Sequence, residues 1–186
     1  MTEQTPRRRD AEATKAVILE AARRTFTERG YDGAGVREIA AAAAVDTRLI
    51  SRYFGSKEGL FEAVVEVAYE KSMMMTPEAN ADAARILLTD TDRHPMDGML
   101  LTLRSAANPR AAAIMRESLE RNYQQRLADA LPGEDAKARA ALLIAICSGV
   151  MLSRLVLGHA ELTGPDVEKL IPYLHKALDA VAVDPG

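Results

Sequence analysis

Residues 36–61 read VREIAAAAAVDTRLISRYFGSKEGLF, and their pattern indicates how the first part of the chain folds. Apolar residues recur at helical spacing before and after residues 42–45, which predicts two short helices joined by a tight turn. Asp46 can cap the second of these helices, and Gly55 ends it. Two helices joined in this way are typical of a helix-turn-helix motif, in which the second helix lies in the major groove of DNA.

One further helix is predicted on each side of this motif. Thr14 to Arg29 places apolar side chains on rows four residues apart, and Gly30 is its C-terminal stop. Ser56 opens the next helix as its N-cap, and that helix continues through Ala68. The pattern therefore predicts a compact helical module around the central pair.

The helix that follows Asp46 has one polar face. Its outward-facing residues are Thr47, Arg48, Ser51 and Arg52, and its inward anchors are Leu49, Ile50 and Tyr53. Arginine pairs with guanine edges, and a Ser or Thr hydroxyl can serve either base. The face is therefore a candidate DNA-reading surface, and the alternative is an ordinary solvated helix face.

The remainder of the chain is also predicted to be helical, because Gly and Pro are sparse and alanine is abundant. The expected helices span residues 79–88, 95–107, 109–131 and 134–159, and a last helix begins at Gly164-Pro165. Pro172 should kink the last of these. The fold class is therefore all-α.

Residues 140–158 carry a single charge, that of Arg154, and are long enough to be tested as a membrane span. Polar interruptions favour a helix buried in a core or at a subunit interface instead, so no membrane association is expected. The small residues Gly149 and Ser153, together with the apolar stripe of the last helix, suit a four-helix bundle formed by two subunits. The alternative is an intramolecular core.

Charge and cysteine content restrict the class of protein. Residues 1–60 hold 11 basic and 9 acidic side chains, whereas residues 61–186 hold 13 and 18. This asymmetry, led by Arg7–Arg9, points to a nucleic-acid contact or to a solvated tail. The lone Cys147 cannot form an internal disulfide, which fits a cytoplasmic protein.

The sequence contains no cluster of ligands for a metal and no catalytic motif. Its histidines, His94, His159 and His175, are scattered, and there is no nucleophile elbow, P-loop or Gly-rich dinucleotide turn. We expect no cofactor, no metal site and no enzymatic activity.

The segments 36–40, 45–46 and 52–61 resemble the DNA-binding domain of the tetracycline-repressor (TetR) family, with the match extending over about residues 16–68. The resemblance implies a homodimer in which two modules read the half-sites of a near-palindromic operator in double-stranded DNA. It also implies phosphate contacts by Tyr53 and Lys57 and base or backbone contacts by the polar face. The predicted DNA-binding residues are Arg37, Thr47, Arg48, Ser51, Arg52, Tyr53 and Lys57.

The chain departs from the family pattern at four positions in and around the helix-turn-helix motif. Gly35 stands where a Ser or Thr usually caps the second helix, and Ala44 replaces the usual turn glycine. Ser51 stands in place of a common tyrosine, and Arg52 in place of a common histidine. The operator sequence therefore does not carry over from the family.

The C-terminal part is rich in methionine, because every methionine except Met1 lies beyond residue 72. Flexible thioethers suit a pocket for a small apolar or amphipathic effector, and they also fill ordinary cores. The predicted effector pocket comprises Met96, Met99, Leu103, Met115, Leu119, Tyr123, Cys147 and Met151. Tyr123 and Arg104 could serve as polar anchors or could act elsewhere, and Cys147 is expected to be a buried core residue.

These observations predict a DNA-binding domain at residues 1–57 and an effector-binding and dimerisation domain at residues 58–186. The predicted function is a one-component, sequence-specific transcriptional regulator, a repressor that a small molecule releases from its operator. The alternative is a dimeric DNA-binding protein that is independent of an effector or acts with a protein partner.

Overall fold

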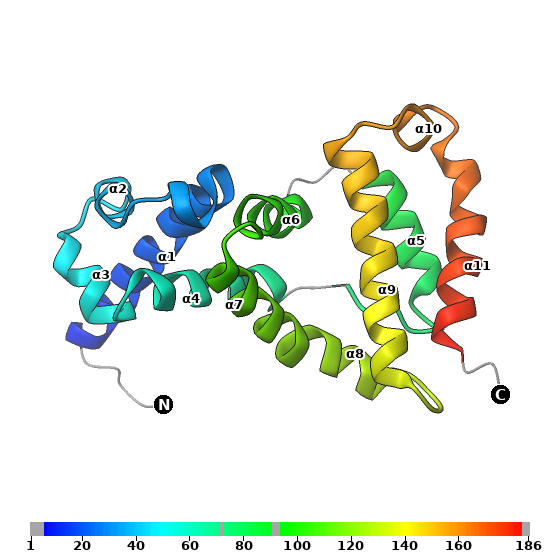
Figure 1. The fold of residues 1–186 in the computed structure, drawn as a ribbon, viewed down its shortest axis with the longest axis horizontal. Helices are drawn as coiled ribbons and strands as arrows, with labels where there is room; N and C mark the ends of the chain where they lie inside the picture. The colour runs from blue at the N-terminus through cyan, green and yellow to red at the C-terminus, as the bar shows by residue number, and fades with distance from the viewer. Residues whose placement is uncertain (1–5, 71–72, 91–93, 184–186) are drawn as a thin grey trace. The chain divides into compact units, whose positions relative to one another are not determined.

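The computed structural model describes residues 6–70, 73–90 and 94–183, and within these ranges the chain forms helices and no strand (Figure 1). The all-α prediction is therefore confirmed for the described residues. The first helices are α1 (Pro6–Gly33), α2 (Val36–Ala42), α3 (Thr47–Phe54), α4 (Lys57–Glu70), α5 (Asn80–Thr89) and α6 (His94–Ser105). They are followed by α7 (Pro109–Leu119), α8 (Gln125–Ala130), α9 (Ala136–Met151), α10 (Ala160–Thr163) and α11 (Ile171–Ala182).

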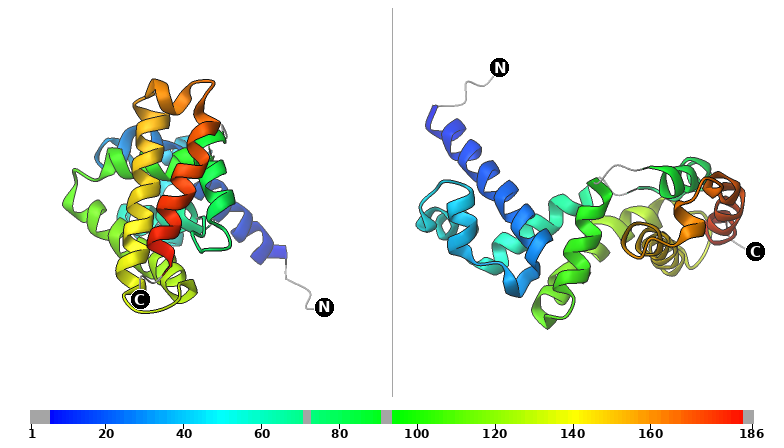
Figure 2. Two further views of the ribbon diagram at one scale, coloured as in Figure 1. Left: turned by 90° about the vertical axis from the view of Figure 1, so that its right-hand side faces the viewer. Right: turned by 90° about the horizontal axis from the view of Figure 1, so that it is seen from above.

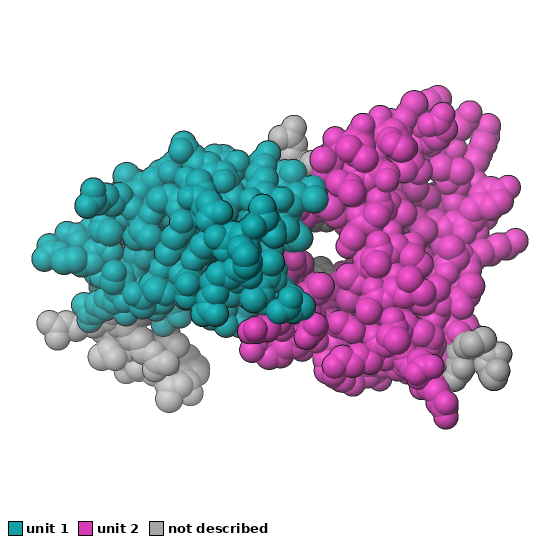
Figure 3. Space-filling view, viewed as in Figure 1, with its two compact units in different colours: residues 1–68, 100–116 teal, residues 69–99, 117–186 magenta. Residues whose placement is uncertain are grey.

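The chain divides into two compact units (Figure 3). Unit 1 comprises residues 1–68 and 100–116, and unit 2 comprises residues 69–99 and 117–186. The helix-turn-helix thus shares unit 1 with α4 and with the end of α6 and most of α7. The two units are defined by how the residues pack. The predicted boundary between a DNA-binding domain and an effector-binding domain, after residue 57, stays a prediction.

The core of unit 1 is built around three aromatic rings. Phe26 and Phe61 meet edge to face with ring centroids 5.0 Å apart, and Tyr31 meets Phe61 at the same distance and in the same manner. Ile39 of α2 and Ile50 of α3 are also fully buried. Both helices of the motif are therefore anchored by an apolar face, as their spacing predicted.

The turn between α2 and α3 is a Schellman motif with alanine in the position that glycine usually takes. The Val45 amide donates to the Ala40 carbonyl at 3.0 Å, and the Ala44 amide donates to the Ala41 carbonyl at 3.1 Å. Ala44 has a φ of 53°, in the left-handed region. Ala44, which replaces the usual turn glycine, therefore adopts a left-handed backbone conformation that is unfavourable for a residue with a Cβ atom.

We expect Ala44→Gly to stabilise the protein by about 0.5–1 kcal/mol, because glycine removes a left-handed strain of about 1–2 kcal/mol and adds some entropy to the unfolded chain. Urea unfolding of the full chain measures the change. Ala41→Gly is the matched control, since Ala41 is exposed within α2, where glycine should destabilise by about 0.5–1 kcal/mol. Equal effects of the two substitutions would contradict the explanation.

Unit 1 also contains a close approach between α1 and the end of α6. Helical geometry in α1 breaks at Gly30, whose φ is 69°, as its role as a stop predicted, and one further turn follows. The Tyr31 amide donates to the Ser105 hydroxyl at 3.0 Å, and the Arg104 guanidinium donates to the Thr27 carbonyl. Asn108 adds a hydrogen bond of 2.7 Å to Asp32. The α6–α7 corner is thus fastened to the end of α1.

The core of unit 2 forms where α5, α8, α9 and α11 pack together, and α9 (yellow) and α11 (red) run side by side in Figures 1 and 2. Its fully buried members include Met75, Leu127, Leu143 and Leu178. Residues 134–159 were predicted as one apolar helix, and the structure has α9 at Ala136–Met151, continued by a π-helical turn at Leu152–Val156.

Two buried arginines bind carbonyl groups at helix ends in unit 2. Arg139 donates to the carbonyl of Ala182 at 2.8 Å at the end of α11 and also to that of Pro132. Arg154 donates to the carbonyls of Leu87 at 3.2 Å and Asp90 at 2.7 Å at the end of α5. Helix C-termini carry unpaired carbonyls and negative partial charge, so both arginines satisfy groups that burial would otherwise leave without partners.

Two π-helical turns lie in unit 2, at Glu120–Gln124 between α7 and α8 and at Leu152–Val156 directly after α9. The predicted kink at Pro172 is wrong. A 3-10 turn, Val167–Leu170, precedes α11, and Pro172 lies in the first turn of α11, where its missing N–H needs no helical partner.

Among the described residues, Ala136–Val156 is long and apolar enough to cross a membrane by length and composition, and 22% of its apolar window is buried in the single chain. Packing of α9 against α5, α8 and α11 accounts for that buried share. The exposed remainder includes Leu142 and Val156.

Candidate nucleic-acid interface

Local sequence fixes where α3 begins and ends. The Asp46 carboxylate accepts a hydrogen bond of 2.8 Å from the Arg48 amide, which is the predicted N-cap. Gly55 ends the helix with a φ of 74°. Ile50 faces the core with 1% exposure, so the opposite face of α3 is directed to solvent.

The predicted DNA-binding residues lie on this part of unit 1 with different exposures. Arg37 of α2 is exposed, as are Arg48, Ser51 and Arg52 of α3. Thr47 and Tyr53 are partly buried. Positions 48, 51 and 52 are spaced three and four residues apart, so they share one face of the helix. The structure therefore brings the candidate base-reading side chains together on a solvent-facing surface.

Arg48 is held by the residue that caps its own helix. Its Nε donates to Asp46 Oδ1 at 3.1 Å and its Nη2 donates to Asp46 Oδ2 at 3.0 Å, although 91% of the Arg48 side chain is exposed. Hydrogen bonds from the Arg48 side chain and amide lower the pKa of Asp46 to about 2. Sequence reasoning identified Asp46 as a cap and Arg48 as a reader, and it missed their ion pair.

Lys57 is placed by the aromatic cluster. Its Nζ lies 4.7 Å from the centroid of the Tyr31 ring, a cation–π contact, at the start of α4. Ser56 caps that helix as predicted, since its hydroxyl accepts from the Gly59 amide at 3.1 Å. Lys57 is partly buried in the first turn of α4, and both a lysine and a helix N-terminus favour a phosphate.

The predicted effector-pocket residues fall into both units. Leu119, Tyr123, Cys147 and Met151 belong to, or pack against, the core cluster of unit 2. Leu103 is exposed and Met115 is buried in unit 1, while Met99 is partly buried at the end of unit 2's first segment. The side chain of Met96 lies outside the described residues, as do the side chains of Arg7–Arg9.

The two candidate polar anchors have partners within the protein. The Tyr123 hydroxyl donates to the Met73 carbonyl and lies 3.2 Å from the Met75 sulfur, and burial raises the pKa of Tyr123. Arg104 binds the Thr27 carbonyl of α1. Burial also raises the pKa of the Cys147 thiol to about 12, which supports its interpretation as a core residue rather than a reactive thiolate.

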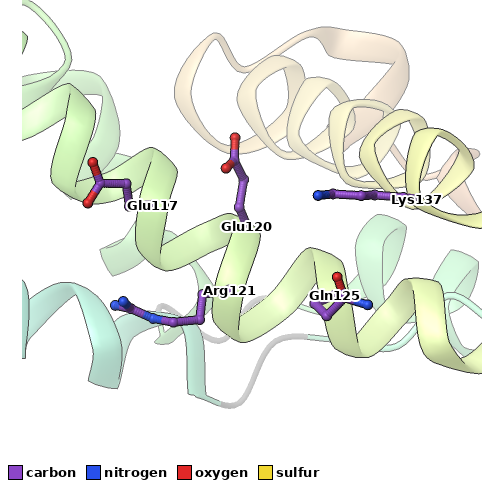
Figure 4. Close-up of a pocket in the computed structure, with 5 residues that line it drawn as sticks. All are labelled: Glu117, Glu120, Arg121, Gln125 and Lys137. Carbon is purple, nitrogen blue, oxygen red and sulfur yellow. The ribbon is translucent and has the colours of Figure 1, made fainter.

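A surface hollow of about 410 Å³ lies on unit 2 and is lined by polar side chains (Figure 4). Its lining residues are Glu117, Glu120, Arg121, Gln125 and Lys137. None of the predicted effector-pocket residues lines it, so the hollow and the predicted apolar pocket are different sites. The predicted pocket stays a prediction.

Unit 1 is a helix-turn-helix module and unit 2 is a helical body, which together define a class of two-part regulatory proteins. Two family models match the chain: bacterial regulatory proteins of the tetR family over residues 18–64, and the tetracyclin repressor-like C-terminal domain over residues 78–181. The chain belongs to the TetR family.

Two curated repressors are similar to part of the chain. The repressor AcnR of Corynebacterium glutamicum is 34% identical over 100 residues, which cover 53% of this chain and 52% of AcnR. The repressor SCO4008 of Streptomyces coelicolor is 48% identical over 58 residues, covering 31% of this chain and 30% of that protein. The chain thus spans about half the length of AcnR and less than a third of SCO4008.

Solved structures share the whole fold. The multidrug binding protein EbrR in complex with ethidium has a TM-score of 0.65 at 23% identity, covering 92% of this chain and 99% of EbrR. At that identity the likeness concerns the fold. It covers 92% of this chain and therefore includes residues of both units.

Proposed function

We propose that the chain is a sequence-specific transcriptional repressor that binds double-stranded DNA as a homodimer and is released by a small-molecule effector. The observation that supports this proposal best is the exposed polar face of α3, held in place by the Asp46 cap and the buried Ile50. Both curated relatives named above are repressors, and the tetR-family model that matches residues 18–64 includes that face. The cytoplasm is the compartment in which such a protein acts.

A dimer is supported by the outward faces of α9 and α11. The exposed residues of α9 and of the turn after it are mostly small or apolar: Ala138, Ala141, Leu142, Ala145, Ser148, Gly149 and Val156. A side chain added at Gly149 would meet nothing within 4 Å in the single chain. Tyr173 and Ala180 of α11 are also exposed. Two such helix pairs related by a two-fold axis form a four-helix bundle, which places two reading helices on one palindrome.

An apolar or amphipathic effector is supported by the body of the protein. EbrR, which shares the fold, was solved in complex with ethidium. Met73, Met74 and Met151 pack against the core cluster that contains Tyr123 and Cys147, and thioethers adapt to irregular ligands. The alternative, an effector-independent dimer, is favoured by the internal hydrogen bond that already satisfies the Tyr123 hydroxyl.

The effector-released repressor and the effector-independent dimer differ in whether a small molecule dissociates the complex with DNA. A panel of apolar and cationic compounds, ethidium included, should contain a compound that raises the thermal unfolding midpoint and dissociates the protein from its operator, since both follow from binding to one conformation. The effector-independent function predicts that no compound changes operator affinity.

We expect Arg52→Ala to weaken specific operator binding by about 1–3 kcal/mol if Arg52 contacts a base, with little change in the free energy of unfolding, since the side chain is exposed. Fluorescence anisotropy with an operator selected from random-sequence duplexes measures the affinity. Arg116→Ala is the control, because Arg116 is exposed in α7 and is not a predicted contact. Unchanged affinity of Arg52→Ala would remove Arg52 from the site.

A further inference from the structure

The Asp46–Arg48 pair has an arrangement that its role as a helix cap does not require. A cap needs one oxygen, and Asp46 Oδ1 supplies it to the Arg48 amide at 2.8 Å. The same carboxylate also receives the Arg48 guanidinium through both of its oxygens, at 3.1 Å and 3.0 Å. Exposed ion pairs stabilise proteins very little, so this contact calls for an explanation other than stability.

The two hydrogen bonds from the Arg48 guanidinium to the Asp46 carboxylate determine which of its N–H groups remain available to bind DNA. Nε and Nη2 face the carboxylate, so the edge formed by Nη1 and the second hydrogen of Nη2 points away from it. That edge carries two parallel donors, which is the pattern that matches the N7 and O6 acceptors of guanine in the major groove. Arg48 lies in the first turn of the recognition helix, the part that meets base edges in helix-turn-helix proteins.

We propose that Asp46 is a positioning residue that orients Arg48 for bidentate recognition of a guanine and thereby sets operator specificity. This inference rests on the proposed function. Fixing the guanidinium before binding reduces the side-chain entropy that is lost on recognition. A carboxylate beside the groove also repels phosphates, so it opposes binding in any register where Arg48 has no guanine to contact.

The carboxylate is ionised at every pH at which DNA binding is measured, since the pKa of Asp46 is about 2. The pair is therefore a permanent feature of the reading surface and does not titrate in the working range. Two other cations of the candidate interface, Arg37 of α2 and Arg52 of α3, are also exposed. Within the described part of the chain, Asp46 pairs with Arg48 rather than with either of them.

The variant Asp46→Asn separates the two roles of the residue. Its amide oxygen can still cap the Arg48 amide, because Asn and Asp are equally good N-caps, whereas its NH₂ group cannot accept from Nη2. Asp82→Asn, in the first turn of α5, is the matched control because it removes the same charge from an exposed position in unit 2. Thermal unfolding of the full chain checks that both variants fold.

The experiment begins by selecting bound duplexes from a random-sequence library with the full-length protein. Each position of the selected site is then replaced by the other bases, and one guanine at a time is replaced by 7-deazaguanine, which lacks the N7 acceptor. We expect one guanine per half-site to depend on Arg48, such that Arg48→Ala abolishes the preference for it. Asp46→Asn should lower that preference by about fivefold or more and should bind mixed-sequence DNA more tightly than wild type.

A double-mutant cycle makes the inference falsifiable. In the Arg48→Ala background, Asp46→Asn should leave base preference unchanged, because a positioning residue acts only through its partner. An unchanged guanine preference in Asp46→Asn, or a uniform loss of affinity across all sequences in Arg48→Ala, would overturn the inference and assign Arg48 to a phosphate. Failure of wild type to select any sequence would instead overturn the proposed function, and this inference with it.

Discussion

Gly30→Ala is expected to destabilise the protein by about 3 kcal/mol or more, since it combines left-handed strain with backbone overlap. Gly30 has a φ of 69°, and a Cβ atom built on it would lie 2.2 Å from the carbonyl oxygen of Arg104. A backbone oxygen cannot rotate away as a flexible side chain can. The substitution therefore requires the end of α6 to move off α1, with loss of the Tyr31–Ser105 hydrogen bond.

The matched control for this prediction is Gly55→Ala. Gly55 has a similar φ of 74°, but an added Cβ would meet nothing within 4 Å, so it should cost only the left-handed strain of about 1–2 kcal/mol. Urea unfolding of both variants isolates the contribution of the close approach. If the two variants had equal free energies of unfolding, the close approach of α1 and α6 at Gly30 would contribute nothing to the loss of stability.

Ala145→Glu is expected to weaken DNA binding at least as much as the loss of a strong base contact. Ala145 is exposed on α9 in the single chain, so a glutamate there should leave the fold intact and place a charge in the centre of the proposed dimer interface. A dimer engages its second half-site at a high effective concentration. Loss of the dimer should therefore weaken operator binding by about a hundredfold or more.

Analytical ultracentrifugation and operator titration measure both consequences of Ala145→Glu. Ala81→Glu serves as the control, since it adds the same charge to an exposed position of α5 and should leave both mass and affinity unchanged. A variant that remained dimeric and bound its operator normally would show that the outward face of α9 is not the interface, and the dimer would have to form elsewhere.

The helix-turn-helix was predictable because local signals determine it. Asp46, Ser56 and Gly55 act on residues within four positions of themselves, and the apolar rows of α2 and α3 mark their buried faces. Ala44 adopts a left-handed conformation at the turn position where glycine is usual, so the turn keeps its backbone geometry although the residue differs. The spacing of the apolar residues in α3 also predicts that its polar face is directed to solvent.

Contacts between distant segments were not predictable from local patterns. Nothing in the composition around Gly30 indicates that the carbonyl of Arg104 approaches it, and Arg139 and Arg154 bind carbonyls at helix ends that lie far away in the sequence. The Pro172 kink was predicted from a single continuous helix, whereas the chain places a 3-10 turn before α11. Long-range packing decides each of these features.

The ion pair of Asp46 and Arg48 lies between these two cases. Both residues were singled out from the sequence, and their separation of two positions is not one at which helix side chains normally meet. The pair forms because Asp46 is the cap, with an extended backbone that turns its carboxylate toward the first turn of α3. An arginine two residues after an acidic N-cap is therefore a signal that sequence reasoning could have used.

Titration of the full chain against its selected duplex, in the presence of competitor DNA at several salt concentrations, tests whether α3 reads a specific DNA sequence. We expect a protected, near-palindromic site bound roughly a thousandfold or more above competitor, with a preference that persists as salt rises. Weak binding that competitor abolishes equally for every sequence would contradict it, because phosphate contacts alone produce that result.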